Sequence, residues 1–125
     1  MPFRTRPIVL IVEDDLLVAT SYDTVTDTGA LVGGPFPSCE SAEEWLRVHS
    51  PDVAIIDMTL RDGNSTQLAK RLCGREIPFV VVSGYPADSV GIDEIFKSAR
   101  WLKKPFASNE LRSALRTMLE SEPST

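Results

Sequence analysis

The stretch PIVLIVEDD, residues 7–15, places three acidic residues directly behind a continuous apolar run. The run itself, residues 7–12, is short and rich in β-branched side chains, which predicts a strand buried on both faces of a sheet. Glu13, Asp14 and Asp15 follow it, and like charges this close repel each other, more so when they are buried. Either the three carboxylates face water at the start of a helix, or a positive group lies among them.

Outward from this stretch, short apolar runs alternate with segments of helical periodicity. Fully apolar strands that alternate with helices indicate an α/β domain whose parallel sheet is covered on both faces. A chain of 125 residues is the usual size of one domain, so we expect a single domain, residues 1–125, with its core at about 7–120. The expected strands are 7–12, 30–34, 52–57, 78–83 and 100–102, and the expected helices are 15–28, 41–49, 67–72 and 108–119.

Several local signals set the expected boundaries. Ser41 and Glu44 form a capping-box pattern that predicts the start of a helix, and PFPS, residues 35–38, is expected to break the chain after the second strand. RDGN, residues 61–64, is expected to be a turn. Pro86 and Gly91 interrupt the periodicity of the segment 86–98, which predicts a short or irregular fourth helix.

Composition excludes several classes of function. Hydrophobic residues make up 42% and charged residues 25% of the chain, as in globular domains. A net charge of −5 and the lack of a basic stripe argue against nucleic-acid binding. The first apolar run is too short for a signal peptide, and none approaches the length of a membrane span. Cys39 and Cys73 fit no metal spacing, so we expect free, partly buried thiols in a cytoplasmic protein.

Polar residues follow each of the main apolar strands. Asp57 ends the third expected strand, Ser83 ends the fourth and is followed by Gly84 and Tyr85, and Lys104 comes just after the fifth. Ligands bind at the carboxyl ends of strands in sheets of this class. If the first and third strands are neighbours, the acids at 13 and 14 converge with Asp57, and such a carboxylate set favours a hard divalent cation.

Four pieces of the sequence together resemble the receiver domain of two-component response regulators, over roughly residues 7–120. They are Glu13-Asp14, Asp57 at the end of an apolar strand, Ser83-Gly84, and Lys104-Pro105-Phe106, in the family's order and with nearly its spacing. The resemblance implies a flavodoxin-like, doubly wound (βα)5 fold with strand order 2-1-3-4-5. PFVVVSGY, residues 78–85, with an irregular fourth helix, partly resembles the single-domain receivers that carry a Phe-Ala-Thr-Gly-Tyr motif.

The resemblance also implies a magnesium site. Asp14 and Asp57 would ligate Mg²⁺ directly, Glu13 through water, and Thr59 through its backbone carbonyl. Asp57 would be the phosphoacceptor, which takes a phosphoryl group from a histidine kinase or a phosphotransfer protein. Such a transfer depends on positioning and charge neutralisation, and Lys104 and Mg²⁺ would supply the positive charges.

A switch and two rate-tuning positions follow from the same resemblance. Ser83 would hydrogen-bond the phosphoryl group and draw its loop inward, and Trp101 would follow that movement. Thr59 and Tyr85 lie where the family tunes dephosphorylation. Three positions depart from the common pattern: Arg61 replaces proline, Trp101 is bulkier than the usual tyrosine or phenylalanine, and Ser83 replaces threonine. Taken alone, Asp14 or Asp15 would more often be a helix cap, and we expect Asp15 to start the helix.

The residues leave competing functions open. The first is a stand-alone receiver that phosphorylates only its own Asp57 and switches protein–protein contacts, with no nucleic-acid or membrane partner. The second is a phosphorylation-independent interaction module with the same fold. The third is an aspartate-nucleophile phosphatase of the haloacid dehalogenase type, but such enzymes need a second aspartate where this chain has Thr59. The chain could also be a piece of a longer protein, such as a hybrid kinase.

Overall fold

A computed structural model describes residues 6–14, 18–60, 62–86, 91–97 and 99–120. It contains a five-stranded sheet, a separate two-stranded hairpin and five helices. The sheet strands are β1 (Ile8–Val12), β2 (Leu31–Phe36), β3 (Val53–Asp57), β6 (Phe79–Ser83) and β7 (Arg100–Lys103). The hairpin is β4 (Thr59–Leu60) with β5 (Gly63–Asn64), and the helices are α1 (Val18–Asp27), α2 (Cys39–Leu46), α3 (Thr66–Gly74), α4 (Glu94–Lys97) and α5 (Ser108–Glu120).

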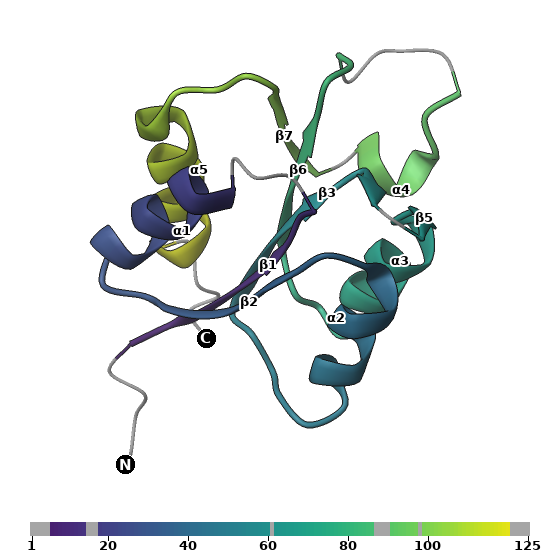
Figure 1. Cartoon of the computed structure of the whole chain (residues 1–125), viewed down its shortest axis with the longest axis horizontal. Helices are drawn as coiled ribbons and strands as arrows, with labels where there is room; N and C mark the ends of the chain where they lie inside the picture. Colours follow the sequence, from purple (N-terminus) through teal and green to yellow (C-terminus); the bar gives the residue numbers. More distant parts are fainter. Residues whose placement is uncertain (1–5, 15–17, 61, 87–90, 98, 121–125) are drawn as a thin grey trace.

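All the strands of the main sheet run parallel, in the order β2-β1-β3-β6-β7. In chain order these are strands 2-1-3-4-5, so the expected doubly wound α/β fold is confirmed. Helices α1 and α5 cover one face of the sheet, and α2, α3 and α4 cover the other (Figure 1). Neighbouring residues of one strand point to opposite faces, so Ile55 packs under α5 and Ile56 packs under α3.

The second strand runs further than expected. It continues to Phe36 and includes Pro35, beside a shift of register against β1 between Leu10 and Val12. Proline is tolerated there because β2 lies at the edge of the sheet, where a missing N–H breaks no ladder. Gly33 in the same strand admits the Trp45 ring, since a Cβ at this position would lie 2.5 Å from Trp45 Cζ2.

Helix α2 begins earlier than the capping-box pattern predicts. Its N-cap is Ser38, whose side chain accepts a hydrogen bond from the Ser41 amide at 3.1 Å. The helix therefore starts at Cys39, not at Ser41, and it ends at Leu46, short of the expected His49. Beyond that end, the Arg75 guanidinium donates to the carbonyl oxygens of Leu46 and His49.

Two further expectations concern connections. The expected turn overlaps an antiparallel hairpin, in which Thr59 pairs with Asn64 and Leu60 with Gly63. The fourth helix is a single turn, as expected, and the Lys104–Pro105 peptide bond is cis. Arg61 and the expected helix start at Asp15 lie outside the described residues.

The remaining expectations concern thiols and membranes. Both cysteines are free thiols, but only Cys39 is partly buried, and Cys73 is exposed on α3. Among the described residues, no helix combines the length and apolar character that a membrane crossing requires.

Candidate functional site

Three carboxylates meet at the carboxyl ends of two neighbouring strands. Strands β1 and β3 pair in parallel, so Glu13 and Asp14, which follow β1, lie beside Asp57, which ends β3. One oxygen from each carboxylate lies within 4.8 Å of the other two. Asp57 is buried, Glu13 is partly buried and Asp14 is exposed, so the cluster runs from the sheet edge out to solvent.

A lysine from another strand end compensates part of this negative charge. Lys104 follows β7, and its backbone amide donates to the Ser83 carbonyl at 2.7 Å, which fixes the position of the residue. Its Nζ lies 2.8 Å from Asp57 Oδ2 and 3.2 Å from Glu13 Oε2. The positive group that the crowded acids require therefore comes from a residue 91 positions away from Glu13.

One ammonium group does not balance three carboxylates. The pKa of Glu13 is raised from 4.5 to about 7, first by burial and then by the hydrogen bond and charge of Asp57, which together outweigh the lowering by Lys104. Burial by itself would lower the pKa of Lys104, but its bond to Asp57 and the charges of Glu13 and Asp57 raise it overall. Lys104 is therefore cationic, and the surplus of hard oxygen donors fits a divalent cation such as Mg²⁺.

The backbone around Asp57 is held by two further residues. The Thr59 amide donates to Asp57 Oδ1 at 3.1 Å, so each carboxylate oxygen of Asp57 has a donor. The Ser65 hydroxyl is fully buried and lies 2.8 Å from the Asp57 carbonyl and 3.2 Å from the Met58 carbonyl. Ser65 was not among the expected site residues, because a serine just before a helix suggests a helix cap and not a support for Asp57.

The expected switch residues, Ser83 at the end of β6 and Trp101 within β7, both hydrogen-bond the backbone of Tyr85. Ser83 is 3% exposed, and its Oγ accepts a hydrogen bond from the Tyr85 amide at 3.0 Å. The Trp101 indole Nε1 donates to the Tyr85 carbonyl at 2.9 Å. Strands β3 and β6 are neighbours, with Asp57 paired to Val82, so Ser83 comes one residue beyond the partner of Asp57. The Tyr85 backbone is thus held from both sides while its ring is exposed.

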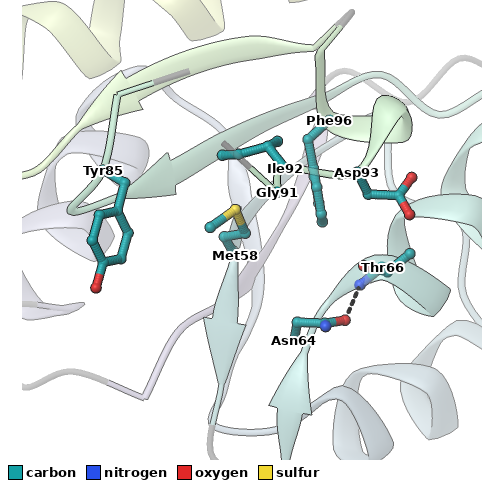
Figure 2. Close-up of a pocket in the computed structure, with 8 residues that line it drawn as sticks. All are labelled: Met58, Asn64, Thr66, Tyr85, Gly91, Ile92, Asp93 and Phe96. Carbon is teal, nitrogen blue, oxygen red and sulfur yellow. Dashed lines mark hydrogen bonds between the residues drawn. The ribbon is translucent and has the colours of Figure 1, made fainter. Parts of the chain in front are cut away.

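A pocket of about 360 Å³ lies beside this cluster of polar groups. Figure 2 shows Met58 between Tyr85 at one end and Asp93 at the other, with Asn64 hydrogen-bonded to the Thr66 amide below. Met58 directly follows Asp57, but neither the three acids nor Lys104 line the pocket. The pocket is therefore adjacent to the acidic site and separate from it.

Comparisons with known proteins agree with this geometry. The family model of the response regulator receiver domain matches residues 9–116. Among solved structures, the chain is similar to SdrG from Sphingomonas melonis Fr1, with 29% identity over 94% of this chain and 99% of that one and a TM-score of 0.76. The beryllofluoride-activated conformation of SdrG from Pseudomonas melonis Fr1 is 32% identical over 93% and 99% of the two chains, with a TM-score of 0.74.

A third structure supports the fold alone. The receiver domain of PhyR from Erythrobacter litoralis is 22% identical over 96% of each chain, with a TM-score of 0.80. Among curated proteins, no significant match is found. Because the family model covers most of the chain and the acidic cluster and lysine lie at the strand ends as described, the chain belongs to the response regulator receiver domain family.

Proposed function

We propose that Asp57 accepts a phosphoryl group from a phosphohistidine on a histidine kinase or a phosphotransfer protein. The observation that carries this proposal is the buried Asp57 carboxylate, held between Lys104 Nζ at 2.8 Å and the Thr59 amide at 3.1 Å, beside two more carboxylates. In the transfer, an Asp57 oxygen attacks phosphorus, the bond from phosphorus to the histidine nitrogen breaks, and the electron pair leaves with the imidazole. The product is an acyl phosphate on Asp57.

The carboxylate set would hold Mg²⁺ for this reaction. Asp14 and Asp57 would be direct ligands, Glu13 would bind through water, and the Thr59 carbonyl would complete the protein ligands. When bound, the ion neutralises charge on the phosphoryl oxygens. Lys104 contributes a second positive charge from the carboxyl end of β7, and burial of Asp57 limits access of water to the acyl phosphate.

The signal would pass through Ser83. Its oxygen accepts from the Tyr85 amide, which leaves the hydroxyl proton free to donate to a phosphoryl oxygen. Movement of Ser83 would shift the Tyr85 backbone, which Trp101 also holds, so Trp101 would follow. Thr59 and Tyr85 are both exposed near the acceptor, where they would tune dephosphorylation.

The output would be a changed affinity for a partner protein in the cytoplasm, without contact to nucleic acid or membrane. Receiver domains are signalling modules, and we propose that this one catalyses only phosphorylation and dephosphorylation of its own Asp57. The beryllofluoride-activated structure of SdrG supports the proposal that Asp57 is phosphorylated, since beryllofluoride imitates a phosphoryl group on a carboxylate.

The test is incubation with acetyl phosphate and Mg²⁺, followed by intact-mass measurement. We expect wild type to gain one phosphoryl group, and Asp57→Asn and Asp14→Ala to gain none. Asp23→Asn removes an exposed carboxylate on α1 and should behave as wild type. Equal labelling of Asp57→Asn, or no labelling of wild type, would overturn the proposal.

A further inference from the structure

The hairpin that follows Asp57 is tied to the start of helix α2. Asp62 lies in the connection between β4 and β5, and its two carboxylate oxygens accept from the first two amides of α2, Cys39 at 2.9 Å and Glu40 at 3.1 Å. The Cys39 thiol also donates to the Asn64 carbonyl at 3.7 Å. A carboxylate at the amino end of a helix interacts favourably with the helix dipole, so these two exposed bonds join segments 22 and 23 residues apart in sequence.

The other end of the same hairpin reaches the acceptor. Thr59 pairs with Asn64 across β4 and β5, and the Thr59 amide donates to Asp57 Oδ1. A hairpin with two residues in each strand thus has Asp57 at one end and α2 at the other. So short a ladder holds little stability of its own. Ser65 fastens its Asp57 end through bonds to the Asp57 and Met58 carbonyls, and Asp62 fastens its turn end to α2.

Helix α2 already has a local cap. The Ser38 hydroxyl accepts from the Ser41 amide, as an N-cap residue does. Asp62 supplies acceptors for two other amides of the same helix end, and those bonds, that of Cys39 first, hold the pKa of Asp62 below its usual value although burial raises it. Ser38 and Asp62 therefore both accept hydrogen bonds from the start of α2, and only Asp62 also holds the hairpin.

We propose that Asp62 is a positioning residue for Asp57: it fastens the hairpin to α2, keeps the Thr59 amide on Asp57 Oδ1, and so couples α2 to the state of Asp57. The coupling to phosphorylation rests on the proposed function of Asp57. This coupling is reciprocal. A change at Asp57 that displaces Thr59 weakens the bonds from the Cys39 and Glu40 amides to Asp62, and loss of those bonds displaces Thr59 from Asp57.

The test compares two ways of weakening the same helix end. Asp62→Ala removes the tie, Asp62→Asn keeps one oxygen acceptor, and Ser38→Ala removes only the local cap, with unfolding temperatures measured for all three. At saturating acetyl phosphate and Mg²⁺, we expect Asp62→Ala to lower the phosphorylation rate at least tenfold, Asp62→Asn to fall between it and wild type, and Ser38→Ala to stay within twofold of wild type. Equal rates for Asp62→Ala and Ser38→Ala would overturn the proposal.

A second measurement does not depend on phosphorylation. We expect the Thr59 amide to exchange with solvent at least tenfold faster in Asp62→Ala than in wild type, and at the wild-type rate in Ser38→Ala. If Thr59 exchange is unchanged in Asp62→Ala, the positioning role is wrong whatever the phosphorylation result. If wild type takes up no phosphoryl group but Thr59 responds to Asp62, the proposed function fails while the positioning role stands.

Discussion

The interiors of β1, β3 and β6 differ sharply from the residues at the carboxyl ends of the same strands. Inside, residues such as Leu10, Ile56 and Val81 are fully buried and apolar. At the ends, the carboxylates of Glu13 and Asp57 lie close together with little exposure to solvent, and both contact the single ammonium group of Lys104. Burying apolar surface stabilises a fold, whereas crowding like charges opposes it, so the same strands carry stability in the middle and reactivity at the end.

This difference predicts opposite signs for truncation in the two regions. Removing an interior side chain leaves a cavity and must destabilise the protein. Removing one carboxylate at the strand ends relieves repulsion and should stabilise it, at the expense of function, as is common where a site is shaped for activity. Stability measurements on matched variants can therefore separate the two regions.

The largest effect is expected in the interior. Ile55 is 2% exposed, so Ile55→Ala should lower the free energy of unfolding by about 2–5 kcal/mol, because the transfer free energy is lost and a cavity remains. Urea denaturation measures this. Val48→Ala is the control: Val48 is 77% exposed, and its truncation should change stability by about 0.5 kcal/mol or less. A loss below about 1 kcal/mol for Ile55→Ala would contradict the role assigned to the interior.

A gain of stability is expected at the strand ends. The pKa of Glu13 rises from 4.5 to about 7 on folding, so its ionisation opposes the folded state. Wild type should therefore lose stability relative to Glu13→Gln as pH rises from 4.5 through 7. In EDTA at pH 8, Glu13→Gln should therefore unfold at a higher urea concentration than wild type. The free energy of unfolding should be larger by about 1–2 kcal/mol, and this difference should vanish near pH 4.5.

The exposed Glu44→Gln on α2 is the matched control, and its difference from wild type should not change over this pH range. Millimolar Mg²⁺ should stabilise wild type more than Glu13→Gln, because the proposed ligand set is complete only in wild type. A Glu13→Gln protein less stable than wild type at pH 8 without metal would show that the Lys104 pair outweighs the repulsion.

The sequence predicts the interiors well because apolar runs are local patterns. The resemblance supplied the strand order, which periodicity alone does not determine. The predicted ends of helices and strands were wrong where tertiary contacts determine them. The capping-box pattern indicated Ser41, but the helix begins after Ser38, where Asp62 accepts from the next two amides. Pro35 fits in a strand only because that strand is an edge, which depends on the order of the whole sheet.

The residues of the candidate site also fall into those that a local pattern predicts and those that only tertiary contacts reveal. Glu13, Asp57 and Lys104 could be found because each ends or directly follows a strand, and parallel strands end at one edge of the sheet. Ser65 and Asp62 could not, because their contacts depend on how the hairpin folds back after Asp57. A serine and an aspartate beside glycine are ordinary turn residues, so no local pattern marks their role.

The smallest effect is expected at Trp101, which joins the two regions. Its ring packs against the core on the α3 side while its indole nitrogen donates to the Tyr85 carbonyl near the surface. Trp101→Phe keeps an aromatic ring and removes that donor, so the loss of stability in urea should be about 1 kcal/mol or less. The Tyr85 amide should nevertheless exchange faster, because its segment loses one of two anchors. A loss above about 2 kcal/mol with unchanged Tyr85 exchange would make Trp101 an interior residue, and would remove the physical basis for its part in the switch.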